Sequence, residues 1–107
     1  MWGVACGTVS AVIRNVVVGT VKDGVTTEQI EEALAAIRGM QVPGVELDVH
    51  TGVDLGLREG NANFAITVDV ADEEAYKVYD ADDEHNRIRR ELFAPISASI
   101  QRIQIRL

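Results

Sequence analysis

The chain has 107 residues, of which 47% are hydrophobic and 25% are charged, and its formal net charge is −7. This length suits one domain and is too short for two, and the apolar content excludes a disordered chain. Phosphate backbones and anionic lipid surfaces are bound by clustered basic residues, and the basic residues here are scattered, so we expect neither a nucleic acid nor a membrane as partner.

The first 12 residues are rich in glycine and small side chains. We interpret them as an N-terminal arm, an extra strand or the product of an upstream start codon, ahead of a domain that occupies residues 13–107. Cys6 is the only cysteine, so no internal disulfide can form, and its surroundings do not suggest a nucleophile. With no basic residue before the apolar start, and no apolar run of roughly 20 residues, we expect a cytoplasmic protein.

The first patterned segments predict a strand followed by a helix. Residues 12–21 are rich in β-branched side chains, and the run Val16-Val17-Val18 does not alternate, which indicates a strand that is covered on both faces. Thr26 and Gln29 match a capping box at the start of a helix that Gly39 can end. The predicted buried stripe of this helix is Ile30, Ala33, Leu34 and Ile37.

Two further strands and a short helix are predicted next. Residues 45–50 alternate apolar and polar side chains after the turn at Pro43-Gly44, and residues 64–70 alternate again beyond a glycine-containing connection. Asp72 is typical of the residue that caps a helix, which we expect to run to about residue 80. The apolar face of that helix combines Ala75, Val78 and Tyr79.

The last part of the chain predicts another helix and a final strand. The helix begins near Asp82 and is ended or kinked by Pro95, and its inward stripe is His85, Ile88, Leu92 and Ile96. In the strand at 99–107, apolar residues alternate with Arg102, Gln104 and Arg106. The order β-α-β-β-α-β predicts an α+β fold of the ferredoxin-like kind, with a four-stranded antiparallel sheet. Helices would cover only one face of this sheet, so a second copy of the chain is the simplest cover for the other.

Several short segments, in this order, resemble the stress-responsive α/β-barrel (Dabb) family. They are Arg14–Val18 with Val21–Gly24, Gln41–Val45, Asp54–Gly60, Phe64–Tyr76, Tyr79 with Asp82–His85, and Phe93–Ile96. No segment is specific by itself, but their common order and spacing over residues 13–107 are. The resemblance implies a homodimer whose two sheets face each other as a barrel. It leaves the activity open, since a minority of relatives resemble polyketide cyclases with a cavity between sheet and helices.

The chain departs from the family pattern at three positions. Asn15 stands where relatives commonly have a histidine, which removes a possible acid–base group from the cavity. Asp83 replaces a proline in the loop before the histidine of the motif, and Asp54 replaces an asparagine after the second strand. Any cyclase-like activity is therefore expected to be weaker than, or different from, that of such relatives.

Tyr79 and His85 are the candidate catalytic residues, and they match the tyrosine and histidine of the cyclase-like relatives. A histidine exchanges protons near neutral pH and a tyrosine hydroxyl can polarise a carbonyl oxygen, so the pair suits aldol-type carbonyl chemistry. The structural alternative is a histidine that donates to a backbone carbonyl beside a core tyrosine. The candidate ligand-binding residues, which would line a pocket between sheet and helices, are Asn15, Val17, Phe64, Tyr79 and His85.

Two functions therefore stay open from the sequence. The first is a homodimeric stress-response-type domain that binds a small hydrophobic molecule, or whose interior side chains fill the cavity; the second is a polyketide-cyclase-like enzyme. His50 is expected on the polar face of its strand. The acidic run at 80–84 lacks the offsets and central glycine of a calcium loop and instead suggests helix caps. The sequence predicts neither a metal nor a cofactor.

Overall fold

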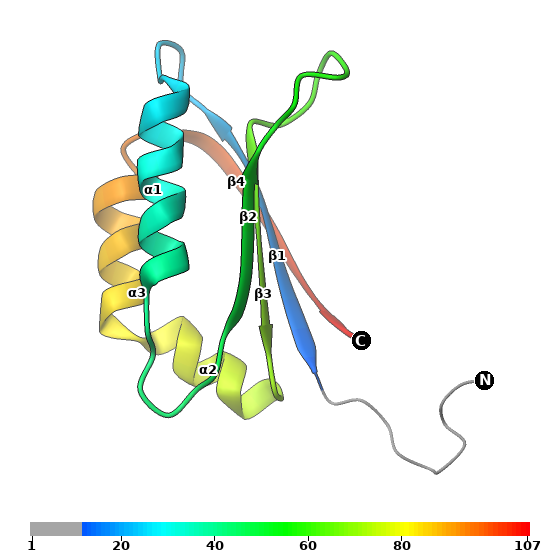
Figure 1. Ribbon diagram of the computed structural model, residues 1–107, viewed down its shortest axis with the longest axis vertical. Coiled ribbons are helices and arrows are strands. Elements are labelled where there is room, and N and C mark those ends of the chain that lie inside the picture. The colour runs from blue at the N-terminus through cyan, green and yellow to red at the C-terminus, as the bar shows by residue number, and fades with distance from the viewer. Residues whose placement is uncertain (1–11) are drawn as a thin grey trace, which may run out of the picture.

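The computed structural model describes residues 12–107, and the expectations for residues 1–11, including Cys6, lie outside this range. The elements in chain order are β1 (Ile13–Val21), α1 (Thr27–Gly39), β2 (Asp48–Val53), β3 (Phe64–Val70), α2 (Glu73–Ala81), α3 (Asp83–Ile88), a π-helical turn η2 (Arg89–Phe93) and β4 (Ser97–Arg106). The strands form one antiparallel sheet in the order β2-β3-β1-β4, with the helices on one face (Figure 1). The predicted ferredoxin-like fold is confirmed. No helix within the described range is long and apolar enough to cross a membrane.

The hydrophobic core lies between the sheet and the helices. Thr26 and Gln29 form both hydrogen bonds of the capping box, and the predicted stripe of α1 is buried. The inward residues of β3 also alternate as predicted: Phe64, Ile66, Val68 and Val70. Burial of such side chains is the main force that holds a helix layer against a sheet.

The second strand begins later than its alternating pattern predicted. The Val45 N–H donates to the Val42 carbonyl oxygen at 3.1 Å, across a turn in which Gly44 has a φ of +83°. This φ is readily adopted by glycine alone. Because Val45 is committed to this turn, the chain joins the sheet only at Asp48.

The last helical region changes its register at η2. The Ala94 N–H donates to the Arg89 carbonyl oxygen at 2.8 Å, which is the i to i+5 pattern of a π-turn. The extra residue rotates Phe93 into the core, where its ring lies 5.6 Å from that of Phe64. Leu92, which the α-helical stripe predicted as buried, is only partly so.

The face of α2 also differs from the prediction at one position. Val78 is 48% exposed, whereas Tyr79 is buried and Tyr76 is partly buried against the core. The two tyrosine rings lie three residues apart, so they share one face of the helix. This face, and not that of Val78, turns toward the sheet.

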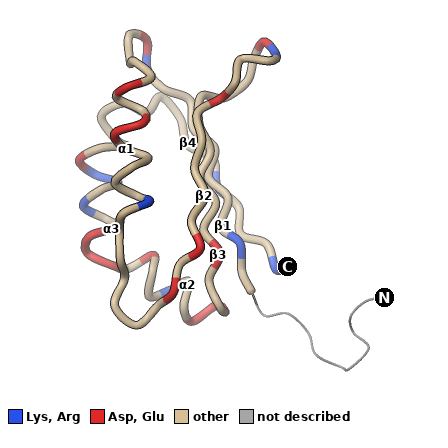
Figure 2. The backbone as a smooth tube through the Cα atoms, viewed as in Figure 1, with Lys and Arg blue, Asp and Glu red and all other residues tan. Residues whose placement is uncertain are grey.

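The second face of the sheet carries apolar side chains, and no helix within residues 12–107 covers it. We call it the open face and define it by Val16, Val18, Ile103 and Ile105, of which the last three are 38%, 59% and 43% exposed. Val17 points the other way, toward the helices, as the alternation along β1 requires. Charged residues lie mainly on the helices, the loops and one end of the sheet (Figure 2).

Candidate functional site

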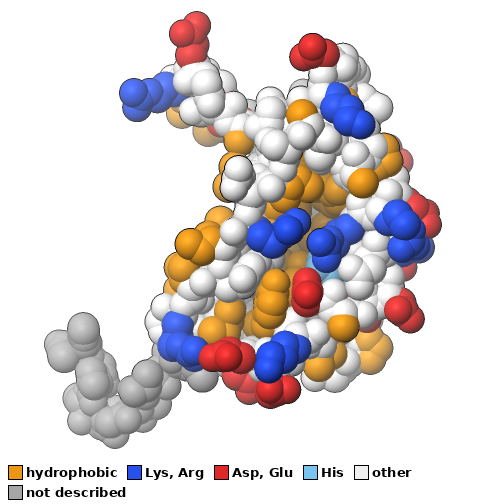
Figure 3. Space-filling model, turned by 180° about the vertical axis from the view of Figure 1, so that it is seen from behind, with side chains coloured by type: hydrophobic (Ala, Val, Ile, Leu, Met, Phe, Trp, Pro, Cys, Tyr) orange, Lys and Arg blue, Asp and Glu red, His pale blue; other side chains and the backbone are white. Residues whose placement is uncertain are grey.

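A cavity of about 370 Å³ opens between α2 and β4 on the helix-covered side of the sheet. Its lining consists of Ile13, Gln104, Ile105 and Arg106 from the strands and Glu73, Tyr76 and Lys77 from α2, and it does not include Tyr79 or His85. We call the space bounded by the lining residues the β4 groove. Figure 3 views this side of the molecule and shows a hollow with hydrophobic side chains on its floor and Lys or Arg side chains around it.

Asn15 is a buried polar residue in the middle of β1. Its Oδ1 accepts a hydrogen bond of 2.7 Å from Gln104 Nε2, directly opposite on β4. This bond offsets the cost of burying an amide in an apolar layer. Because Gln104 also lines the β4 groove, it joins Asn15 to this site.

The junction between α2 and α3 positions His85. Asp82 ends α2 by donating its N–H to the Tyr79 carbonyl oxygen at 3.2 Å, and it begins α3 by accepting from the His85 N–H at 3.0 Å. His85 Nδ1 lies 3.0 Å from the same Tyr79 carbonyl oxygen. His85 is therefore held by hydrogen bonds of both its backbone and its ring.

The hydrogen bond of the ring determines its tautomer. A carbonyl oxygen can only accept, so Nδ1 carries the proton and Nε2 keeps its lone pair. His85 is 6% exposed, and its pKa is lowered, first by burial and then by the positive charge of Arg89. At pH 7 the side chain is thus a neutral imidazole whose Nε2 can accept a proton.

Tyr79 stacks on His85, with their ring centroids 4.1 Å apart and an interplanar angle of 26°. Burial raises the pKa of Tyr79 to about 12, so its hydroxyl keeps its proton and is a donor at neutral pH. The ring of Tyr76, which lines the β4 groove, lies 6.1 Å from that of Tyr79. Tyr76, Tyr79 and His85 form a row of rings that runs inward from the groove.

The structure brings Tyr79 and His85 into contact, but it places Phe64 elsewhere. Phe64 lies opposite Gly19, four residues along β3 from the partner of Asn15, which corresponds to roughly 13 Å along the strand. Its ring occupies the space beside Gly19, where an added Cβ would lie 2.1 Å from Phe64 Cζ. Val17 lies between Asn15 and Gly19 on β1 and packs against the core.

Two neighbours of the site, Tyr76 and Gln104, were not among the residues singled out from the sequence. The spacing of Tyr76 to Tyr79 is a signal that could have identified the first, because residues three apart share a helix face. Gln104 alternates with Ile103 and Ile105, so the sequence alone suggests that it faces solvent. Only the pairing of β4 with β1 turns it toward the helices.

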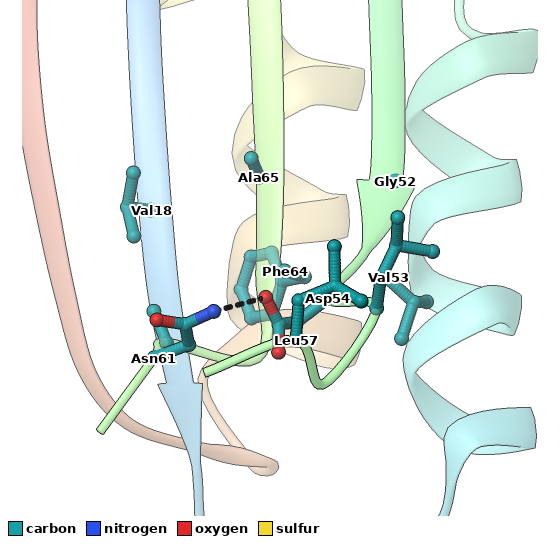
Figure 4. Close-up of a pocket in the computed structure, with 10 residues that line it drawn as sticks. Val18, Gly52, Val53, Asp54, Leu57, Asn61, Phe64 and Ala65 are labelled. Atoms are coloured by element: carbon teal, nitrogen blue, oxygen red, sulfur yellow. Dashed lines mark hydrogen bonds between the residues drawn. The ribbon is translucent and has the colours of Figure 1, made fainter. Parts of the chain in front are cut away.

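A second cavity, of about 430 Å³, lies beside the open face under the loop that connects β2 to β3. Val18 and Ala65 contribute from the sheet and Leu57 from the loop (Figure 4). Asp54 accepts hydrogen bonds from Asn61 Nδ2 at 3.0 Å and from the Gly56 N–H at 2.9 Å. Its carboxylate therefore serves to close the loop, and the cavity is mainly an apolar surface.

The acidic run at 80–84 forms caps and ion pairs. Asp82 caps α3, Asp80 lies 3.6 Å from Arg89, and Glu84 binds Arg87 at 2.8 Å. Across residues 12–107, no group of three or more His, Cys, Asp or Glu side chains is arranged to hold a metal ion.

Comparison with known proteins gives both a family match and similar folds. Residues 13–105 match the family model of the stress responsive A/B barrel domain. No curated protein matches the chain. A dimeric ferredoxin-like protein of unknown function from Thermobifida fusca is 28% identical, with a TM-score of 0.80 over 90% of this chain and 91% of that one.

Two more distant structures show the fold alone. A Dabb family protein from Mesorhizobium loti is 20% identical, with a TM-score of 0.71 over 88% of this chain and 94% of that one. A hydroxynitrile lyase from Passiflora edulis is 17% identical, with a TM-score of 0.77 over 92% of this chain and 94% of that one.

Proposed function

Because the chain belongs to the stress responsive A/B barrel domain family, we propose that it acts as a homodimer that binds a small, largely hydrophobic molecule in the β4 groove of each copy. The two parts of this proposal rest on opposite faces of the sheet. The open face supports the dimer, and the helix-covered face supports the ligand site.

The apolar side chains of the open face support dimerisation. Ile103 is 59% exposed, and no helix of the described chain covers it, while burial of apolar area stabilises by roughly 25 cal/mol per Å². A second copy, placed face to face, would cover this surface with the same set of side chains, as a two-fold interface requires. The similar protein from Thermobifida fusca is described as dimeric.

The row of rings that leads from the β4 groove to His85 is the observation that carries the ligand site. Small-molecule sites are mostly apolar cavities of about 300–1,000 Å³ with a few oriented polar groups. The cavity of about 370 Å³ beside Tyr76 falls within this range. Tyr79 and His85 are buried behind Tyr76 and are not part of the cavity wall; they would supply the polar groups to a ligand that reaches past Tyr76, and the junction at Asp82 fixes the orientation of His85.

A titration with 2-octanone, a neutral molecule with an apolar chain and a carbonyl group, tests the site. We expect a saturable shift of the His85 ring protons in NMR spectra. Tyr76→Ala should weaken binding by roughly tenfold, because it removes an aromatic wall. Val78→Ala, on the exposed side of the same helix, should bind like the wild type. Unshifted His85 resonances at millimolar 2-octanone would contradict the site.

A second function, proton transfer next to a carbonyl group, is favoured by the protonation states of Tyr79 and His85. A neutral His85 can remove a proton from the carbon beside the carbonyl through Nε2. The Tyr79 hydroxyl would then donate a hydrogen bond to the enolate oxygen. Asn15, in the position where relatives commonly have a histidine, cannot exchange protons, so the reaction would differ from that of cyclase-like relatives.

Hydrogen–deuterium exchange next to the carbonyl of 2-octanone in D₂O tests this second function. His85→Ala should lower the exchange rate by roughly 10²–10⁴-fold. Tyr79→Phe should lower it by a smaller factor, because it deletes one donor and keeps the ring. If the wild type exchanges no faster than buffer, and His85→Ala lowers the melting temperature by several degrees, His85 is a structural residue.

A further inference from the structure

We infer that the ligand of the β4 groove carries a carboxylate group that Arg102 binds, while its apolar part enters the groove. This inference rests on the proposed ligand site and adds the chemical class of the ligand, an amphipathic monocarboxylate. It makes Arg102 the residue that determines specificity for the charged end.

Arg102 lies on the helix-facing side of β4. It pairs with Val17 in the register of β1 and β4, two residues from Gln104, whose side chain reaches Asn15. Residues two apart on a strand share a face and are about 7 Å from each other. Arg102 therefore lies next to the Asn15–Gln104 pair, on the face opposite the open face. A second copy on the open face would leave its guanidinium accessible.

Arg102 also lacks an intramolecular partner in the described part of the chain. The other Lys and Arg residues in the helices and strands all form ion pairs: Arg14, Arg38, Lys77, Arg87, Arg89, Arg90 and Arg106. The side chain of Arg102 forms neither an ion pair nor a hydrogen bond with any residue in 12–107. The chain has 17 Asp and Glu residues and only 10 Lys and Arg residues. Despite this excess of acids, no carboxylate of the described chain forms an ion pair with Arg102.

A second guanidinium acts on the same ring row from the helix layer. Arg89 of η2 lies 3.6 Å from Asp80, so its charge is already partly offset. Burial raises the pKa of Tyr79, and the positive charges of Arg89 and Arg102 both oppose that rise. Figure 3 shows Lys or Arg side chains on both sides of the hollow, over its hydrophobic floor.

The chemistry of arginine selects a carboxylate for this position. Its planar guanidinium presents parallel N–H donors that match the two oxygens of a carboxylate. The groove wall at Ile13 and Tyr76 suits an apolar chain. A molecule held at both ends would span the region beside Tyr79 and His85, where proton transfer is proposed.

Octanoate and 2-octanone test this inference, because they have similar apolar chains and differ in charge. We expect wild-type protein to bind octanoate at least about tenfold more tightly, as a hydrogen-bonded charge pair provides. Arg102→Gln should abolish this preference and leave the affinity for 2-octanone unchanged, which also shows that the variant is folded. Added salt should weaken octanoate binding alone.

Arg58→Gln is the matched control, since it removes the same charge from an exposed loop and should keep the preference for octanoate. Equal affinities for the two probes, or a preference that survives Arg102→Gln, would overturn the inference while the ligand site stands. If neither probe shifts the His85 resonances, the ligand site itself fails and the inference fails with it.

Discussion

The carbonyl oxygen of Tyr79 accepts from two groups, the Asp82 N–H at 3.2 Å and His85 Nδ1 at 3.0 Å. The second bond is the one that a purely structural histidine would make. It is also the bond that would orient a catalytic imidazole, because it directs the proton to Nδ1 and leaves Nε2 free. The two interpretations therefore differ only in what Nε2 contacts, which a bound probe can decide.

The protonation of His85 predicts a pH dependence of stability. Burial holds its pKa below the ordinary value of 6.5, so the unfolded chain binds more protons than the folded chain in the window below 6.5. The contribution of neutral His85 to the free energy of unfolding is fully present above about pH 6.5. It is lost as the pH falls below 6.5 and through the folded-state pKa. We expect the melting temperature to fall between pH 7 and pH 5 by more in the wild type than in His85→Gln.

Val78→Ala is the control for this measurement, because it changes an exposed side chain that carries no titratable group. This variant should keep the pH profile of the wild type. A wild-type profile in His85→Gln would mean that the buried imidazole does not titrate in this way.

At the scale of the elements, Asp82 joins two short helices that have little stability of their own. Helices of the length of α2 and α3 are marginal in water, so their ends must be fixed by caps and packing. Asp82 does this for both helices, since its N–H closes α2 and its carboxylate opens α3. The proline found in relatives at position 83 is replaced by Asp83, and the helix still begins there.

Asp82→Ala should lower the free energy of unfolding by about 1 kcal/mol, the usual cost of losing a helix cap. It should also broaden or shift the His85 ring resonances, because the His85 N–H loses its acceptor. Asp83→Ala changes the neighbouring acid, which makes no capping hydrogen bond, and should cost less. Urea unfolding compares the two variants, and equal losses would show that the cap does not position α3.

At the scale of the whole molecule, the sheet has two faces with different roles. The helix-covered face contains the core and, beyond β1, the β4 groove with Gln104. The open face presents Val18 and Ile103 to the outside. A chain of this size buries only about two-thirds of its unfolded surface, so covering the open face would add substantially to its stability.

Ile103→Asp tests the proposed dimer. Ile103 is 59% exposed in one chain, so the variant should stay folded by circular dichroism. In a face-to-face dimer it would bury an unpaired carboxylate, which costs several kcal/mol and should give monomers in light scattering. Val78→Asp, on α2, should remain dimeric. A wild-type protein that stays monomeric at micromolar concentration would contradict the dimer.

Val17→Asp reports on a different part of the molecule. Because Val17 faces the helices, an aspartate there would enter the core and should destabilise each chain. We expect unfolded or aggregated protein, in contrast to the folded monomer of Ile103→Asp. A folded, dimeric Val17→Asp would show that this position tolerates a charge.

The sequence by itself determined the features that depend on neighbours along the chain. The capping box at Thr26 and Gln29, the stripe of α1 and the alternation of β3 are local patterns, and each is present in the structure. Their order was sufficient for the ferredoxin-like fold. The contact of Tyr79 with His85 also follows from local geometry, because six residues around one helix junction bring the two rings together.

Only the tertiary structure decided which way β4 faces and what lies beside it. Alternation along a strand shows that its two faces differ, but it does not show which face meets the helices. The bond from Gln104 to Asn15 joins residues 89 positions apart, and pairing of β4 with β1 fixes it. The same pairing turns Ile103 to the open face and Arg102 to the helix-covered face. The late start of β2 and the π-turn at η2 likewise arise from hydrogen bonds that compete with the periodic pattern.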